Sequence, residues 1–521
     1  MRAITLVQLP PELLFLILVP LDAHDLVRVR KTCKTLKETV DHSEMLQYII
    51  DLGYFQMEAS EMDVPPATRR ERLRQHDAAW QRFEYKQKYT LPAVMVGPLS
   101  DILGGVYGSA GSKDCIIFAC MPFGTDSSDL HSWNCPVDAT TLMDFTFCPA
   151  QDLLVVVALS PDSLTYAYDI HLRSLTTNDA HPDAAQPILK ALDTDTIGHA
   201  IPQSTSAEVH IMGSYVIVLL WNVVVKERDC MQMWDWKSKN GYQFSLLFND
   251  GIHDWSFIAE DQFLVLDIHG IMEIYSIADK SKPPRCTAKL SLPSLMDHFS
   301  YTEVSVGKNI TSGSMLSHPR RSYQPPCPFH PSTSDQLIVI HVGVEFRNEL
   351  FRYSFFTLRS AILELESLFC RTYGQPTLNG PKLLWSMWGP RYTTWFRATK
   401  LRINDMDWVS SLYGFRVVDP LDNSASDAPL EPRRLRIRDF NPHIARHYHA
   451  QDKPDYRGRL VQGELTNTIS RPFTEPLGSA LPYHEIVSEG LFYADTAHMD
   501  ESRIMLVKRD RRGQQIDILV F

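Results

Sequence analysis

The sequence contains no long hydrophobic run and no excess of basic residues. A membrane-spanning helix needs about 18 or more consecutive apolar residues, and no stretch of this chain reaches that length. The formal net charge is −11, whereas a general nucleic-acid-binding protein needs a basic surface. We therefore predict no membrane span and no nucleic-acid partner.

Cysteine is present but shows no paired pattern. The chain has 9 cysteines, an odd number, and no Cys-x-x-Cys spacing. A disulfide framework, or a zinc site of the common type, needs such pairing. The pattern therefore indicates a reducing compartment, the cytoplasm or the nucleus, and the sequon at Asn309 is interpreted as a chance match.

The common catalytic motifs are missing as well. Residues 104–113, GGVYGSAGSK, do not fit the phosphate-binding loop, which requires Gly, four residues and then Gly-Lys-Ser/Thr, so we predict a hairpin there. His443, His447 and His449 lie close together, but neither a Cys partner nor a His-Glu-x-x-His helix accompanies them. No Gly-x-Ser-x-Gly turn occurs. We expect no catalytic residue, no cofactor and no metal site.

The composition that remains is that of an ordinary globular protein. Of the 521 residues, 44% are hydrophobic and 22% are charged. The 33 prolines and 24 glycines are spread along the chain, as expected for many turns between short strands. This length can hold one small domain and one large domain.

Three short apolar-striped segments lie within residues 9–40. Pro10 and Pro11 suit a first helical turn, where a missing N–H costs nothing, and Pro20 ends the segment that they begin. Asp22 or Asp25 can cap the next helix. A unit this small is not expected to be stable alone, so it should dock on a partner or on the rest of the chain.

The order and spacing of these residues resemble an F-box. The matching positions are Leu9-Pro10-Pro11-Glu12-Leu13, Ile17, Leu21, Leu26, Arg30 and Cys33. The family often carries Trp near position 36, where this chain has Leu36. The resemblance implies binding to a Skp adaptor and, through it, to a cullin scaffold. The adaptor-binding residues that it implies are Leu9, Pro10, Leu13, Ile17, Leu21, Leu26, Val29 and Cys33.

A secretory signal peptide is the competing interpretation of the same segment. Arg2 would supply its basic end, and residues 13–19 would supply its short apolar core. Glu12 and the two prolines interrupt that core where it should begin, and no small-x-small cleavage site follows. The F-box interpretation is therefore favoured.

A linker helix is predicted after the F-box. Residues 67–87 are amphipathic, with Leu73, Trp80 and Phe83 near one face. We expect this helix to pack on its neighbours, and the alternative is a partner-binding helix. The predicted divisions are an F-box over 1–50, a helical linker over 51–90 and a β domain over 91–521.

The rest of the chain repeats a pattern of strand, tight turn and strand. Apolar runs begin at residues 153, 215, 262 and 336, and Asn240-Gly241 and His269-Gly270 suit hairpin turns. Repeats of the WD type recur every 40–45 residues or so, and the spacing here is uneven. The pattern therefore favours a degenerate β-propeller with insertions, within an overall α+β multidomain fold.

Two segments resemble WD-repeat blades. They are residues 262–279 and residues 231–244, which carry Trp234-Asp235. The layout is similar to that of a group of fungal F-box proteins, which combine an F-box, a linker helix with an Ala-Trp pair and a divergent propeller. The corresponding features here are Ala79-Trp80 and the segment PAQDLLVVV at 149–157.

A substrate-binding surface is predicted from arginines and tryptophans. Arg434, Arg436 and Arg438 should share one strand face, which is either solvated or able to bind acidic or phosphorylated segments. Trp385, Trp388 and Trp395 flank Gly389-Pro390, which suggests a loop near a propeller rim. We predict that these two segments approach each other.

The sequence thus favours a non-catalytic substrate-recognition subunit of a ubiquitin ligase of the SCF type, acting in the cytoplasm or nucleus. One alternative is a propeller scaffold that acts outside a ligase. Another is a propeller hydrolase, which would need convergent His and carboxylate groups. The apolar end, residues 516–521, is predicted to close the propeller against residues 91–96 or 115–120.

Overall fold

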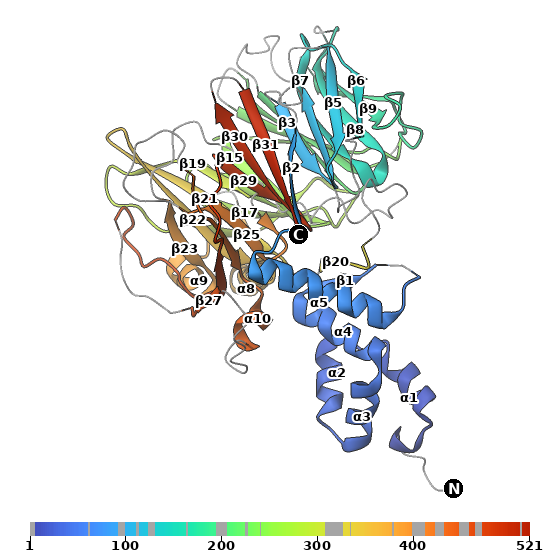
Figure 1. Ribbon diagram of the computed structural model, residues 1–521. Coiled ribbons are helices and arrows are strands. Elements are labelled where there is room, and N and C mark those ends of the chain that lie inside the picture. The colour runs from blue at the N-terminus through green and yellow to red at the C-terminus, as the bar shows by residue number, and fades with distance from the viewer. Residues whose placement is uncertain are drawn as a thin grey trace.

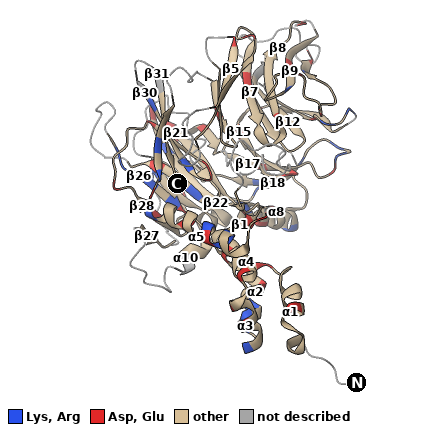
Figure 2. Ribbon diagram, turned by 45° about the vertical axis from the view of Figure 1, so that its right-hand side comes forward, with Lys and Arg blue, Asp and Glu red and all other residues tan. Residues whose placement is uncertain are grey.

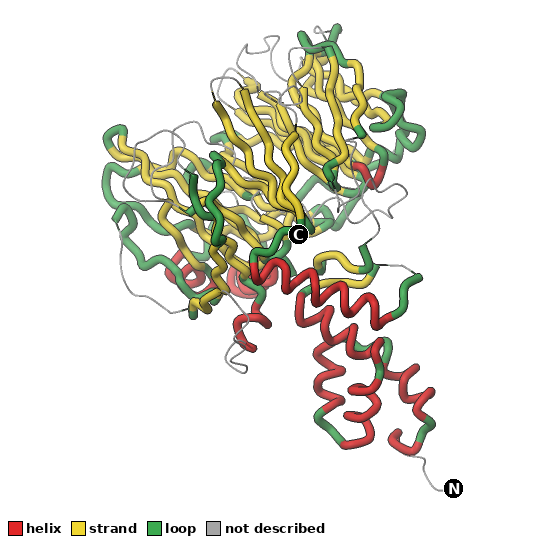
Figure 3. The backbone as a smooth tube through the Cα atoms, viewed as in Figure 1, coloured by secondary structure: helices red, strands yellow, loops and turns green. Residues whose placement is uncertain are grey.

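The computed structural model has a helical N-terminal arm and a large region of β-sheets (Figure 1). Figure 3 shows the same division, with helices gathered at the N-terminal end and strands in the remainder. The structure describes residues 6–521 except 61–62, 92–98, 111–113, 123–130, 163–164, 194–205, 225–227, 240, 308–326, 334, 378–379, 399–411, 422–431, 448–457, 464–470 and 511–512.

The F-box-like segment is a compact set of short helices. Asp22 caps the second helix, because its Oδ1 accepts a hydrogen bond from the Asp25 N–H at 2.8 Å. Leu36, where the family often has Trp, packs in the core of this unit. The elements are η1 (Leu6–Gln8), α1 (Pro11–Leu18), α2 (Ala23–Arg30), α3 (Lys34–His42) and α4 (Glu44–Phe55).

The linker helix α5 spans Pro66–Arg82 and ends five residues before the sequence prediction. Phe83 adopts a left-handed conformation at φ +54°, and the Glu84 N–H donates to the Ala79 carbonyl at 2.9 Å. This bond closes the helix in the usual C-terminal manner. The chain then enters strand β2 (Gln87–Leu91).

Seven antiparallel sheets of four or five strands form the β region in the part of the chain that the structure describes. We call them blades 1 to 7. They are, in order, β3 (Leu99–Leu103), β4 (Val106–Ala110), β5 (Cys115–Cys120), β6 (Ser132–Pro136); β7 (Leu142–Cys148), β8 (Leu153–Leu159), β9 (Tyr166–Ser174), β10 (Ile188–Asp193); β11 (Ser206–Met212), β12 (Tyr215–Val224), β13 (Arg228–Asp235), β14 (Gln243–Phe248); β15 (Ile252–Ala259), β16 (Gln262–Asp267), β17 (Ile271–Ser276), β18 (Arg285–Ser291); β19 (Ser300–Val306), β21 (Leu337–Phe346), β22 (Glu349–Leu358), β23 (Thr394–Ala398); β24 (Leu412–Tyr413), β25 (Arg416–Pro420), β26 (Leu435–Asp439), β28 (Tyr483–Val487), β27 (Gly458–Val461); and β29 (Thr496–Met499), β30 (Arg503–Asp510), β31 (Gly513–Val520), β2.

The blades form a closed ring, because each neighbouring pair shares a buried hydrophobic cluster. The clusters join blades 1 and 2, 2 and 3, 3 and 4, 4 and 5, 5 and 6, and 6 and 7. A seventh cluster, which includes Tyr107 and Ile518, joins blade 7 back to blade 1. This arrangement is a β-propeller, and the predicted strand pairs from 153, 215, 262 and 336 are confirmed.

Strand β2 closes the ring by completing blade 7 beside the C-terminal strand. Leu91 pairs with Ile516, and Gln87 pairs with Val520. The fully buried Arg503 of the same blade donates to the Met121 carbonyl of blade 1 at 3.1 Å. The predicted closure of 516–521 against Leu91 is therefore confirmed, whereas residues 92–96 lie outside the described part of the chain.

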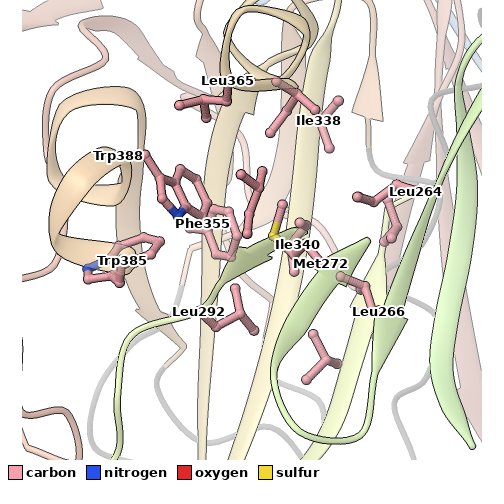
Figure 4. Close-up of a cluster of buried hydrophobic side chains, with 14 of the residues drawn as sticks. Leu264, Leu266, Met272, Leu292, Ile338, Ile340, Phe355, Leu365, Trp385 and Trp388 are labelled. Atoms are coloured by element: carbon pink, nitrogen blue, oxygen red, sulfur yellow. The ribbon is translucent and has the colours of Figure 1, made fainter. Parts of the chain in front are cut away.

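Insertions within the blades explain the uneven spacing of the repeats. Blade 5 carries the largest one, in which two helices separate β22 from β23 and cover the blade 4–blade 5 core (Figure 4). A hairpin is also present at the start of the predicted segment 104–113, because Gly104 and Gly105 form a turn between β3 and β4, whereas residues 111–113 lie outside the described part of the chain. The remaining elements are β1 (Met57–Ala59), η3 (Pro149–Gln151), β20 (Phe329–Pro331), α8 (Arg359–Tyr373), α9 (Trp385–Tyr392) and α10 (Pro442–His447).

None of the described helices is both long and apolar enough to cross a membrane. All nine cysteines are unpaired thiols.

Candidate interaction sites

An apolar surface is exposed at the start of the helical arm. We call it the F-box face, and Figure 1 shows that it lies at the end of the arm away from the propeller. Such a concentration of exposed apolar side chains is typical of an interaction site. Its members are Leu6 (47% exposed), Val7 (41%), Leu13 (46%), Leu16 (65%) and Ile17 (44%).

The predicted adaptor-binding residues divide into an exposed and a buried group. Pro10, Leu13, Ile17 and Cys33 are exposed, and Leu9, Leu21 and Val29 are partly buried. Leu26 is completely buried in the F-box core, so it stabilises the helices and cannot contact an adaptor directly. Leu6, Val7 and Leu16 were missed, although their position beside the Leu-Pro turn could have indicated them.

A strap from blade 5 holds helix α4 against the propeller. The Tyr48 hydroxyl donates to the Pro328 carbonyl at 2.8 Å, and β1 pairs with β20 from Met57–Pro331 to Ala59–Phe329. From blade 6, the Asn441 amide donates to the Tyr54 carbonyl at 3.0 Å. Helix α4 therefore crosses the predicted domain boundary at residue 50, and it contacts the propeller on both sides of that boundary.

Helix α5 packs into the seam between blades 6 and 7. Its Trp80 ring stacks on Phe521, with ring centroids 4.1 Å apart and an interplanar angle of 6°. His76 contacts the Glu501 carbonyl oxygen at 2.8 Å. On the other side of α5, Arg70 and Arg74 bind the Asp51 carboxylate of α4 at 2.8 and 2.7 Å. The linker thus joins the F-box to the propeller through ordered contacts on both faces, as predicted for a packing helix.

A buried ion triad lies at the centre of this junction. The Arg416 guanidinium binds Asp77 of α5 and, at 2.9 Å, Asp439 of blade 6. Burial raises the pKa of the Asp77 carboxyl to about 6, although the Arg416 charge opposes the shift. The triad could not be read from the sequence, because Asp77 and Arg416 are 339 residues apart.

Replacing Arg416 with Met is expected to destabilise the chain by about 3–5 kcal/mol, because two buried carboxylates then lack their partner. The double variant Arg416→Met with Asp77→Asn should recover part of that loss, since it removes one uncompensated charge. Urea unfolding followed by tryptophan fluorescence measures both changes. A single variant as stable as the wild type would show that the triad does not hold the junction.

Glu501, on the loop that meets α5, should make stability depend on pH. Burial raises the pKa of its carboxyl from 4.5 to about 7. The folded chain then holds this proton more tightly than the unfolded chain, so the contribution to stability grows as pH falls from about 7 to 4.5. We expect Glu501→Gln to melt above the wild type at pH 8, and this difference to become much smaller at pH 5. A difference in melting temperature that is independent of pH would contradict this.

The predicted tryptophan surface proves to be core. Trp385 and Trp388 are completely buried, and their indole N–H groups donate to the carbonyls of Pro476 at 2.9 Å and Ser291 at 3.2 Å. The expected loop at Gly389-Pro390 is wrong, since these residues lie in α9. Pro390 falls near the end of this two-turn helix, where it removes only one backbone hydrogen bond. Trp395 stacks on Phe355 at 4.7 Å.

The predicted arginine face exists, but ion pairs occupy much of it. Arg436 and Arg438 both bind the Asp419 carboxylate of β25, the latter at 2.9 Å. Arg438 also lies over the Phe396 ring, 4.2 Å from its centroid. Phe396 and Trp395 are neighbours on opposite faces of β23, so the tryptophans and arginines do not share a surface. Arg434 alone of the three arginines is exposed.

The described residues offer little that could hold a metal or a cofactor. The only cluster with metal-ligating geometry there is Asp22, His24 and Asp25, an exposed group at the start of α2 whose Asp22 already serves as the cap. A cavity of about 20 Å³ lies beside His76, Arg416 and Glu501, large enough only for water. His449 and the side chain of His447 lie outside the described part of the chain.

Comparison with known proteins assigns the N-terminal unit. Residues 6–46 match the family model "F-box-like". No curated protein matches the sequence. Three structural matches are the C-terminal WD40 domain of Sif2 (9% identity, 81% of this chain and 94% of that chain, TM-score 0.33), Hsv2 of Kluyveromyces lactis (11%, 52% and 70%, 0.27) and U3-55K (11%, 51% and 80%, 0.24).

The order of the strands in the sheets and the closed ring of clusters define the propeller. The chain therefore combines an F-box-like domain with a β-propeller. F-box-like domains are typically protein-interaction modules. The F-box-like domain suggests a Skp-type adaptor as one partner, and the propeller suggests a second protein partner.

Proposed function

We propose that this protein is a substrate-recognition subunit of a cullin-RING ubiquitin ligase of the SCF type, acting in the cytoplasm or nucleus. The observation that carries the proposal is the F-box face, which is apolar, exposed and matched by the family model. An adaptor seated there would bury apolar area, which is the main driving force of protein association. The adaptor would in turn connect the chain to a cullin.

The helical arm would fix the distance between the adaptor and the substrate. Blades 5, 6 and 7 all contact α4 or α5, so the arm has little freedom to swing. A rigid arm holds a captured substrate at a high effective concentration near the transferring enzyme. In this proposal the chain supplies proximity, and its partners supply the transfer chemistry.

The loops at the other end of the blades would be free to hold a substrate. Successive loops of an antiparallel blade alternate between its two ends. The β29–β30 loop meets α5 through Glu501, so the next loop of blade 7, β30–β31, lies at the end away from the arm. The loop between the second and third strands of every other blade lies at that same end. Leu159, Ile268 and Leu350 are exposed at that end of blades 2, 4 and 5.

Affinity purification with proteasome inhibition tests the proposal. The structure favours a truncation that removes residues 1–42, because removal to residue 50 would cut α4 and delete Tyr48, whose hydroxyl binds the Pro328 carbonyl. We expect the intact chain to recover adaptor, cullin and substrate, and the truncated chain to recover substrate alone. The control is Leu384→Asp, which changes an exposed apolar side chain far from the F-box.

A scaffold acting outside a ligase is the second candidate, because the family match at residues 6–46 points to an adaptor, which the chain could bind without a cullin. Recovery of the adaptor without cullin would support the scaffold and contradict the ligase. Recovery of neither from the intact chain would contradict both.

A further inference from the structure

A basic and aromatic surface lies in the seam between blades 6 and 7. Arg433 and Phe492 exchange two backbone hydrogen bonds of 2.8 and 2.7 Å, so these segments pair like antiparallel strands. The next pair, Arg434 and Leu491, then faces the opposite side from Phe492. Phe492 is buried and lies 6.1 Å from the Phe83 ring, so Arg434 and Leu491 face solvent.

The exposed side chains here alternate with buried ones. Leu491 is 58% exposed and Tyr493 is 50% exposed, whereas Phe492 and Ala494 between and beyond them are buried. Tyr85, 40% exposed, lies on the Phe492 side of these segments, with its ring 6.3 Å from that of Phe492. Leu491 and Tyr493 therefore form a short apolar strip on this surface.

Positive charge borders this strip. The Lys508 ammonium lies 5.9 Å from the Tyr493 ring centroid, and Lys508 and Lys88 share the buried Asp517 carboxylate at 2.6 and 2.9 Å. Two ammonium groups on one carboxylate leave a surplus of positive charge. Figure 2 shows Lys and Arg along β30 and β26, the strands that flank the seam.

Arg434 adds a further positive charge to this surface. Arg434 has no ion pair within the described residues, whereas the acids on the same connecting segment, Glu489 and Asp495, already have partners. The chain as a whole carries a net charge of −11. A local positive region on an acidic protein selects a partner of negative charge.

We propose that the seam formed by Arg434, Leu491, Tyr493 and Lys508 binds an extended protein segment that carries carboxylates beside an aromatic or aliphatic side chain. Arg434 would form a bidentate ion pair with a carboxylate of the segment, and the segment's aromatic or aliphatic side chain would pack on Leu491 and Tyr493. This deepens the proposed function by naming the class of substrate segment. It also moves the site from the predicted tryptophan loop to the outer seam of the propeller.

Fluorescence polarisation with the full chain tests this. One labelled peptide alternates Glu with Tyr, and its matched control alternates Gln with Tyr. We expect the acidic peptide to bind with an affinity that falls as salt rises. Arg434→Glu should weaken it at least about tenfold, since a hydrogen bond to a charged group contributes about 1.5–3 kcal/mol.

Matched variants keep the result interpretable. Arg434→Gln and Leu491→Ser should each weaken binding, whereas Lys239→Glu, an equal charge change on an exposed turn of blade 3, should not. Equal effects of Lys239→Glu and Arg434→Glu, equal binding of the Gln peptide, or equal binding of a single-stranded oligonucleotide would each overturn the site. Loss of peptide binding with adaptor capture intact separates this proposal from the ligase assignment.

Discussion

A chain with Leu9→Ala, Pro10→Ala and Ile17→Asp is expected to lose adaptor capture completely while its propeller stays folded. Ile17 is 44% exposed on α1, so an aspartate there costs little in the free protein. In the complex the same charge would be buried against an apolar partner, which is strongly unfavourable. Loss of three apolar contacts of about 1.5–3 kcal/mol each predicts a decrease in affinity of at least ~100-fold.

Two controls separate binding from folding in this experiment. Thermal unfolding of the triple variant should match the wild type, because these residues lie outside the blades. Leu26→Ala should instead lower stability of the F-box unit, since Leu26 fills its core. Undiminished capture by the triple variant, measured by co-purification with recombinant adaptor, would refute the F-box assignment.

Deletion of residues 516–521 is expected to abolish cooperative folding of the propeller. The segment belongs to β31, which pairs with β30 on one side and β2 on the other. Its Ile516, Ile518 and Leu519 fill the clusters on both faces of blade 7, so the deletion opens the ring at two seams. The loss of several core side chains at about 2–5 kcal/mol each exceeds the usual stability of a domain.

A milder substitution in the same strand provides a reference for the loss of stability caused by the deletion. Ile518→Val, which removes one buried methyl group, should lower stability by about 0.5–1.5 kcal/mol and leave one cooperative transition. Circular dichroism and limited proteolysis measure both variants. A truncated chain that still unfolds in one sharp transition at the wild-type temperature would show that β31 does not close the ring.

Local patterns predicted the elements that local chemistry determines. The prolines of α1 and the apolar run at Leu153–Leu159 fix a helix start and a buried strand within a few residues. The end of α5 was misplaced because the left-handed turn at Phe83 carries no glycine to mark it. Pro390 suggested a break in α9, but burial of Trp385 and Trp388 outweighs the one hydrogen bond that proline removes.

The junction and the seam depend on contacts that no local pattern encodes. The strap pairs Met57 with Pro331, and the seam pairs Arg433 with Phe492, in both cases across long sequence separations. Likewise, the sequence predicted a free basic face for the arginines of β26, because their partner Asp419 lies on the neighbouring strand β25. Sequence reasoning could place them on one face but could not show that an acid already occupied it.

The closure of blade 7 has a consequence for the newly made chain. Thr90 of β2 and its hydrogen-bond partner Asp517 of β31 are 427 residues apart, so β2 leaves the ribosome long before β31 exists. At ~5–20 residues per second this wait lasts about 20–85 s. During it β2 is an open strand edge, and Lys86 and Lys88 supply the charges that discourage such edges from pairing with other nascent chains.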